Sequence, residues 1–215
     1  MPVVKISIIL FVFIISLFVA PAVDKLQFHV SRCAQKQGDS CAITGNLYYV
    51  GDGVRKDYSQ ALNFYLKACS LNDAGACKNI GFIYEFEKGV DQDLTLALKF
   101  YTKSCSLGSG SGCFQLGNMY LFGRGTPRDF QKAASYYRRS CDLNFGGGCN
   151  NYGVMLYKHP EDPRNLSTSA EYILKGCKLG DTDGCDNCFR GFCREVKRSK
   201  ATNPNLSFIK KQGVL

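Results

Sequence analysis

Twelve cysteines in a chain of 215 residues are the side chains best able to do chemistry. Thiols bind zinc, act as nucleophiles or form disulfide bonds, and their spacing separates these uses. Seven residues lie between Cys69 and Cys77, which is too wide for a C-x-x-C redox motif, and the region has no histidine to complete a metal site. The even number of cysteines favours a disulfide framework instead.

The N-terminus indicates the compartment in which these cysteines act. One lysine within residues 1–5 precedes the apolar run "ISIILFVFIISLFVA", and Ala20 and Ala22 occupy the −3 and −1 positions of a cleavage site. This pattern predicts a signal peptide over residues 1–22. An uncleaved anchor is the alternative, although the run is short for a membrane span. We expect a secreted or periplasmic protein, without stable membrane insertion after cleavage, whose cysteines persist as disulfides.

The cysteines recur with a period of 36 residues. Ten of them form five C-x7-C pairs: Cys33 and Cys41, Cys69 and Cys77, Cys105 and Cys113, Cys141 and Cys149, Cys177 and Cys185. Glycine and aspartate columns share the register: Gly45, Gly81, Gly117 and Gly153; Asp57, Asp93 and Asp129. Such a period predicts a repeat protein in which each unit contacts only its neighbours.

Each unit reads as two helices. The first follows the second cysteine, as in "CFQLGNMYLFGRG" over residues 113–125, where a broad apolar face that includes Phe122 ends at a glycine. The second begins with the aspartate column as N-cap, as in "DYSQALNFYLKAC" from Asp57, although "TSAE" from Thr168 predicts a later start in the fourth unit. The glycine column marks close helix contacts rather than phosphate binding, because the lysine of a P-loop is missing.

The positions of the helices explain the cysteine pairs. Cys69 ends one helix and Cys77 lies in the first turns of the next, so a disulfide would join neighbouring helices across their turn. The period favours this local pairing in all five units. Cys188 and Cys193 fall outside the array and could pair with each other. A zinc site is the alternative there, with four ligands: Cys177, Cys185, Cys188 and Cys193.

These patterns divide the chain into three parts. We expect a signal peptide over 1–22, a repeat domain over 23–199 with five units in 28–187 and a C-terminal cap, and a tail over 200–215. The formal net charge of +9 is scattered, with its densest cluster from Arg194 to Lys200. A solvated basic surface accounts for this charge, and we expect no nucleic-acid partner.

The stretch "LGNMYLFGRGTPRDFQKAASYYRRSCDLNFGGGC", residues 116–149, resembles the Sel1-like repeat, a relative of the tetratricopeptide repeat. The cysteine-stapled form with this period is similar to the Helicobacter cysteine-rich proteins. The resemblance implies an all-α, right-handed αα-solenoid with one disulfide per repeat. It also implies a penicillin-binding protein with slow β-lactamase activity, which hydrolyses the β-lactam amide.

The residues themselves supply no independent catalytic motif. One S-x-x-K match, "SFIK" from Ser207 to Lys210, lies in the tail without the partner motifs of a serine β-lactamase. His29 and His159 lie in different units, outside any metal-ligand spacing. We expect no cofactor and no metal, and the catalytic residues of any enzyme remain unknown.

A non-catalytic adaptor is the alternative function. Solenoids present concave surfaces to peptides and proteins. The ligand would be a protein or peptide, or a β-lactam or cell-wall-derived small molecule. We expect four asparagines of the first helices to line that face: Asn79, Asn118, Asn150 and Asn151.

Overall fold

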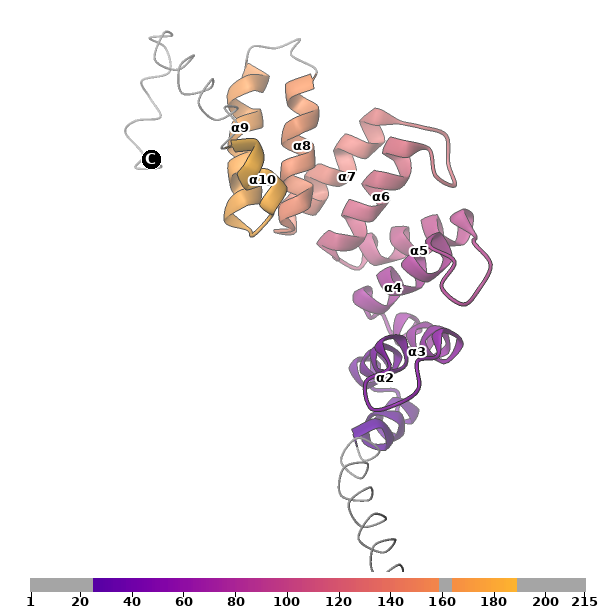
Figure 1. Cartoon of the computed structure of the whole chain (residues 1–215). Coiled ribbons are helices and arrows are strands. Elements are labelled where there is room, and N and C mark those ends of the chain that lie inside the picture. The colour runs from indigo at the N-terminus through magenta and orange to yellow at the C-terminus, as the bar shows by residue number, and fades with distance from the viewer. Residues whose placement is uncertain (1–24, 159–163, 189–215) are drawn as a thin grey trace, which may run out of the picture. The chain divides into compact units, whose positions relative to one another are not determined.

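The computed structural model describes residues 25–158 and 164–188, shown in colour in Figure 1. All regular secondary structure in these two ranges is helical. The chain divides into two compact units, Met1–Leu107 and Gly108–Leu215, which are treated separately below. The predicted signal peptide, His159, Cys193 and the "SFIK" match fall outside the described residues, and the predicted domain boundaries remain predictions.

The helices of both units follow the 36-residue period in pairs. In the first unit, residues 25–34 are helical and precede two pairs: α2 (Gly38–Val50) with α3 (Tyr58–Ser70), and α4 (Ala74–Glu85) with α5 (Leu94–Ser106). The second unit holds α6 (Gly110–Phe122) with α7 (Phe130–Asp142), α8 (Gly146–Lys158) with α9 (Arg164–Lys178), and the short α10 (Thr182–Asn187). We call α2, α4, α6 and α8 the first helices of their repeats. The prediction of an all-α repeat fold is confirmed.

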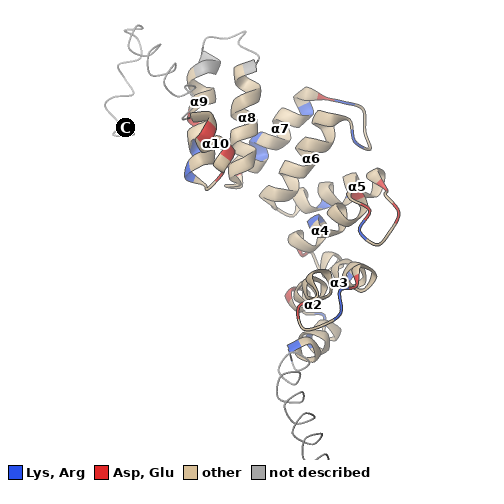
Figure 2. Cartoon of the chain, in the orientation of Figure 1, with Lys and Arg blue, Asp and Glu red and all other residues tan. Residues whose placement is uncertain are grey.

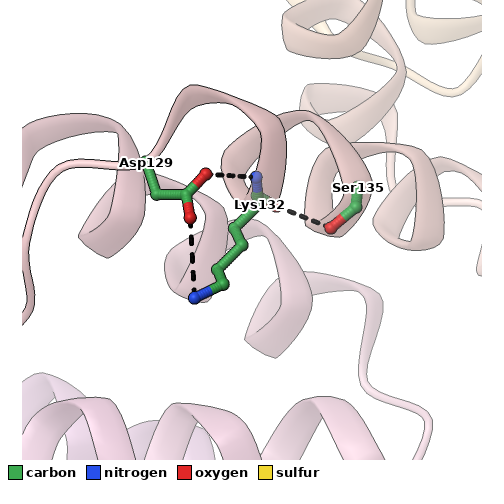
Figure 3. Close-up of polar contacts among 3 residues, drawn as sticks. All are labelled: Asp129, Lys132 and Ser135. Carbon is green, nitrogen blue, oxygen red and sulfur yellow. Dashed lines mark hydrogen bonds and ion pairs between the residues drawn. The ribbon is translucent and has the colours of Figure 1, made fainter.

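Short polar side chains cap these helices. The predicted caps Asp57, Asp93 and Asp129 each accept a hydrogen bond from the backbone N–H three residues further on. At α7 this is the 2.8 Å bond from Lys132 N to Asp129 Oδ1, drawn in Figure 3. A second set of caps, which we did not predict, starts the helices after the cysteine turns: Asp73, Ser109 and Asp181. Each cap satisfies a backbone donor that the helix cannot bond internally.

The helix boundaries correct two predictions. The first helices begin three residues before the second cysteine, so α6 starts at Gly110 rather than Cys113. The cause is the Ser109 cap, which holds the N–H of Gly112 and lets the first turn form before the cysteine. In the fourth repeat α9 begins at Arg164 and not at Thr168. The "TSAE" segment therefore lies inside the helix.

The glycine column allows the helices of a pair to cross closely. A Cβ atom added to Gly81 would lie 2.7 Å from the ring of Tyr101. The same pairing occurs in the neighbouring repeats, between Gly45 and Tyr65 and between Gly117 and Tyr137. All three tyrosines are at most 1% exposed. The aromatic ring of the second helix thus occupies the space that the missing glycine side chain leaves, in line with the contact role predicted from the sequence.

Disulfide bonds join the consecutive repeats. Four pairs with Cα–Cα distances between 4.4 and 4.9 Å are Cys33–Cys41, Cys69–Cys77, Cys141–Cys149 and Cys177–Cys185. Cys105, Cys113 and Cys188 are disulfide-bonded as well. The prediction of one disulfide per repeat is confirmed. The bond between Cys177 and Cys185 argues against the zinc site, because it removes two of the four ligands. Pairing of Cys188 with Cys193 remains a prediction.

Lysine side chains reinforce the joints between repeats. Lys103 Nζ donates to the carbonyl oxygen of Cys69 at 2.8 Å, and Lys175 Nζ donates to that of Cys141 at 3.1 Å. In both cases the acceptor lies in the last turn of the preceding second helix, where carbonyls lack intrahelical partners and a positive charge is favoured. Cys69 and Cys141 therefore each form a disulfide bond through Sγ and accept a lysine hydrogen bond through the carbonyl oxygen.

Candidate functional site

The first helices present the same three register positions at the surface. Positions three and seven residues apart lie on one face of a helix. We call these residues the display stripe: Ile43, Asn46 and Val50 on α2; Asn79 and Phe82 on α4, with Phe86 at its C-cap; Gln115, Asn118 and Phe122 on α6; Asn151 and Val154 on α8. None of them is fully buried. Each helix has an amide at one or both of the first two positions, and the third position is apolar at Val50, Phe86 and Phe122.

In the first unit a buried tyrosine binds the amides of two consecutive first helices. The Tyr65 hydroxyl donates to Asn46 Oδ1 at 2.7 Å, and Asn79 Nδ2 lies 3.5 Å from the same oxygen. Burial raises the pKa of Tyr65 above its usual range, and a hydrogen bond with Asn79 partly opposes that rise. The hydroxyl therefore stays protonated and remains a donor at neutral pH.

The second unit contains an equivalent cluster 72 residues further along the chain. Tyr137 donates to Asn118 Oδ1 at 2.6 Å, and Asn118 Nδ2 donates to Gln115 Oε1 at 2.9 Å. Burial raises the pKa of Tyr137 to about 12, against the opposing effect of a hydrogen bond with Asn151. Tyrosine and asparagine thus hold the same relation in two repeats, which shows that the arrangement follows from the register.

The tyrosines determine which atom of the asparagine side chain remains free to bind a ligand. Tyr65 and Asn79 together fill both acceptor positions of Asn46 Oδ1, so the Nδ2 group of Asn46 is the part left for other partners. Within the described residues, Asn46 Nδ2 and Gln115 Nε2 have no hydrogen-bond partner, and Asn46 is exposed. The display stripe therefore offers oriented donors that can bind carbonyl oxygens.

The second repeat replaces this amide by an acid. Tyr101 donates to Glu85 Oε2 at 2.6 Å, and the glutamate is only 3% exposed. Glu85 lies three residues beyond the register position of the asparagines in the other two repeats, which Phe82 occupies here. This repeat accordingly satisfies its tyrosine inside the helix pair and contributes Phe82 and Phe86 to the display stripe, at the positions of an amide and an apolar residue in α6.

Three of the four asparagines expected at the surface lie in the display stripe: Asn79, Asn118 and Asn151. The expectation was wrong for Asn150, which is 5% exposed and accepts a 2.9 Å hydrogen bond from Asn187 Nδ2. It occupies the register position of Phe114, which packs between repeats. Asn46 was missed, although its 19-residue separation from Tyr65, repeated between Asn118 and Tyr137, was visible in the sequence.

The apolar face predicted for α6 also needs a correction. Leu116 and Met119 are buried, but Phe122 is 64% exposed. Phe122 is the last residue of α6, where the chain turns away from the helix pair, so no neighbouring element covers it. Phe86, its equivalent at the C-cap of α4, is 41% exposed. Large apolar side chains thus stand at the surface in both units.

Other chemically capable side chains do not gather into a site. His29 is partly buried beside the ring of Phe28, and its Nδ1 atom has no hydrogen-bond partner. Over residues 25–158 and 164–188, no three histidines, cysteines or acids stand close enough together to hold a metal ion. Within the same ranges no helix has the length and apolar character needed to cross a membrane.

The repeat architecture and its disulfides define a helical-repeat protein of the tetratricopeptide-like class. The Sel1 repeat model matches residues 38–73, 74–109, 110–145 and 147–181, which together make up more than half of the chain. The protein belongs to the Sel1 repeat family. The matched segments begin at, or one residue after, the start of a first helix and end beyond the following second helix. No curated protein matches the chain.

Solved structures of Sel1 repeat proteins are similar to this chain. A Sel1 repeat protein from Oxalobacter formigenes is 26% identical with a TM-score of 0.64, over 70% of this chain and 60% of its own. Helicobacter pylori cysteine rich protein B is 26% identical with a TM-score of 0.51, over 61% of this chain and 94% of its own. A protective antigen of uropathogenic Escherichia coli with an SLR fold shares the fold at 24% identity and a TM-score of 0.67. That match covers 74% of this chain but only 34% of the antigen.

Proposed function

We propose that this protein is an exported binding module in which the display-stripe residues of one unit hold an extended peptide segment of a partner protein. The observation that carries the proposal is the fixed orientation of the amides. Tyr65 and Tyr137 hold Asn46 and Asn118 by their oxygens, and the donors left without a partner among the described residues are Asn46 Nδ2 and Gln115 Nε2. The disulfide joints support export, because such bonds persist in oxidising compartments.

An extended peptide suits the chemistry of the display stripe. Its backbone presents carbonyl oxygens that accept hydrogen bonds from the side-chain amides. Its side chains meet the exposed apolar ends of the first helices, such as Val50 and Phe86, which are 65% and 41% exposed. Backbone contacts of this kind provide affinity with little sequence preference, and the apolar positions add selectivity. We therefore expect recognition of short segments with spaced apolar residues.

The substitution Asn46→Asp tests this proposal directly. Aspartate keeps an oxygen that accepts from Tyr65 but lacks the Nδ2 donor. Peptides would first be selected from random phage-displayed decapeptides, and one selected peptide would be measured by fluorescence anisotropy. We expect Asn46→Asp to weaken binding by about tenfold, which corresponds to about 1.4 kcal/mol, with an unchanged melting temperature.

A matched control removes the effect of charge alone. Gln60 is exposed on α3, outside the display stripe, so Gln60→Glu adds the same charge elsewhere. Equal loss of affinity in Gln60→Glu and Asn46→Asp would contradict the proposal. So would a selection that yields no peptide binding in solution.

Family resemblance provides the second candidate, slow hydrolysis of β-lactams. The display stripe contains no serine or cysteine that could attack a β-lactam carbonyl, so the geometry favours the binding module. A chromogenic β-lactam assay on the disulfide-intact protein separates the two candidates. Turnover above a heat-inactivated control would favour the enzyme, and its loss in Asn46→Asp would place that activity on the display stripe.

A further inference from the structure

The turn between α6 and α7 holds an arginine in a fixed position. Arg128 Nε donates to the carbonyl oxygen of Leu121 at 2.8 Å. The guanidinium carbon lies 4.4 Å from the centre of the Phe130 ring, within the range of a cation–π interaction. One hydrogen bond and one ring therefore restrain the side chain, although Arg128 is exposed. Figure 2 shows the basic residues along this turn.

The neighbouring acid does not neutralise this arginine. Asp129 accepts the backbone N–H of Lys132, and its other oxygen lies 3.5 Å from Lys132 Nζ (Figure 3). Among the described residues, Arg128 forms no ion pair. Its two terminal nitrogens have no hydrogen-bond partner there. The turn thus holds the guanidinium of Arg128 in place with its terminal N–H groups available to a ligand. The neighbouring carboxylate of Asp129 is already bound to Lys132.

The turn between α4 and α5, one of two equivalent turns in the first unit, shows that the fold does not need this charge. Gln92 occupies the register position of Arg128, and its Nε2 donates at 2.8 Å to the carbonyl of Glu85, the equivalent of Leu121. Leu94 occupies the position of Phe130. A neutral amide therefore makes the same structural hydrogen bond. The turn between α2 and α3 has a cation beside a ring at the same positions, since Lys56 Nζ lies 5.9 Å from the centre of the Tyr58 ring. A positive charge and an aromatic ring are thus an addition that some of these turns carry and the turn itself does not require.

Two exposed rings lie with the arginine at this turn. Phe122 follows Leu121, the residue whose carbonyl binds Arg128, and is 64% exposed. Phe130 is 46% exposed. We call Phe122, Arg128 and Phe130 the arginine–aromatic patch. A guanidinium binds a carboxylate through parallel hydrogen bonds, and the adjacent rings can cover an apolar side chain.

We infer that the arginine–aromatic patch docks an acidic peptide segment, with a carboxylate on Arg128 and a neighbouring apolar side chain against Phe122 and Phe130. The inference rests on the proposed function, because Phe122 is the last display-stripe residue on α6. It specifies in addition that the bound peptide is negatively charged. An anionic membrane fits less well, since each basic residue near such a surface contributes only about 1 kcal/mol. The patch supplies a single cation.

The experiment uses a labelled peptide with the sequence EEFEEFEE as the probe and QQFQQFQQ as its neutral counterpart. Arg128→Gln reproduces the Gln92 arrangement, so it removes the charge and keeps the hydrogen bond to Leu121. We expect Arg128→Gln to weaken binding of the acidic probe by about tenfold and Arg128→Lys by about threefold, because lysine lacks the planar fork. Phe130→Leu, which copies Leu94, should weaken it by a similar threefold.

Arg138→Gln is the matched control, because this exposed arginine lies on α7 away from the patch. Affinity within twofold of the unmodified protein supports the inference. Equal loss in Arg138→Gln and Arg128→Gln, equal binding of both probes, or binding to phosphatidylglycerol vesicles but not to the acidic probe would overturn it. If Arg128→Gln has no effect while Asn46→Asp weakens the selected peptides, the patch fails and the proposed function stands. If instead Arg128→Gln weakens binding of the acidic probe and Asn46→Asp has no effect on the selected peptides, the inference about the arginine–aromatic patch stands and the proposed function of the display stripe fails.

Discussion

At the scale of single residues, the hydroxyl of a buried tyrosine connects the packed core with the amides of the display stripe. The ring of Tyr65 fills the space beside Gly45, and its hydroxyl reaches the surface amide of Asn46. The same pairs recur at Gly117, Tyr137 and Asn118. A change in the core of a repeat would therefore move the surface amide that the tyrosine holds. If the display stripe binds as proposed, stability and binding are coupled through one side chain in each of these repeats.

The carboxylate of Asp129 gives a prediction that depends on pH. The backbone N–H of Lys132 lowers the pKa of this carboxyl below its usual value of 3.8. Because the pKa is lower in the folded state, the carboxylate stabilises the fold above the unfolded value, and this contribution is lost as pH falls through the folded value. Asp129→Asn keeps a capping oxygen that does not titrate.

We expect the melting temperature of the unmodified protein to exceed that of Asp129→Asn at about pH 6, and this excess to shrink progressively below about pH 4. Thermal unfolding followed by circular dichroism at several pH values measures the difference. An excess that is the same at about pH 3 and pH 6 would show that the charge of Asp129 does not contribute through its cap.

At the scale of the helices, a glycine without a side chain sets the distance between the two helices of a pair. Gly81 brings α4 against α5 at the ring of Tyr101. Alanine would improve helix propensity by about 1 kcal/mol but would place a Cβ 2.7 Å from that ring. We expect Gly81→Ala to lower the free energy of unfolding by about 1–3 kcal/mol, since the ring is enclosed and cannot move aside.

Urea denaturation measures this effect, and Gly75→Ala is the control. Gly75 also lies in α4, where an added Cβ meets only the cap oxygen of Asp73 at 3.3 Å. A loss of stability in Gly75→Ala as large as that in Gly81→Ala would mean that the ring contact does not set the helix spacing.

The sequence was sufficient to predict the helix pairs, because the 36-residue period placed caps, glycines and cysteines in fixed columns. The Asp93 cap and the Gly81 contact follow directly from those columns. The start of α6 did not, because Ser109 caps a turn in which the cysteine was the more conspicuous residue. The display stripe was only partly predicted. Asn150 and Asn151 are adjacent in the sequence, and only packing decides which of them is buried.

At the scale of the whole molecule, each disulfide bond between consecutive repeats contributes its own share of the free energy of unfolding. The chain-entropy model assigns about 2.5 kcal/mol to a disulfide that closes a loop of about nine residues. We expect Cys69→Ser with Cys77→Ser to lower the free energy of unfolding by about this amount. Since repeats contact only their neighbours, hydrogen exchange should quicken in α3 and α4 and stay unchanged in α8 and α9.

The corresponding change at Cys141 and Cys149 serves as the reciprocal test. It should quicken exchange in α7 and α8 and leave α3 unchanged. Faster exchange throughout the described helices in both variants would indicate that the repeats unfold as a single cooperative body. Hydrogen exchange of each variant, read by mass spectrometry, gives the comparison.

The short span of each disulfide also affects how the chain can be made. Cys33 and Cys41 are eight residues apart, and the next cysteine, Cys69, follows 28 residues later. A chain that emerges N-terminus first can therefore close each of the early bonds before a competing thiol appears, although Cys188 follows Cys185 after only three residues. For the cysteines before Cys177, correct pairing then follows from the order of emergence, without a search among alternative partners.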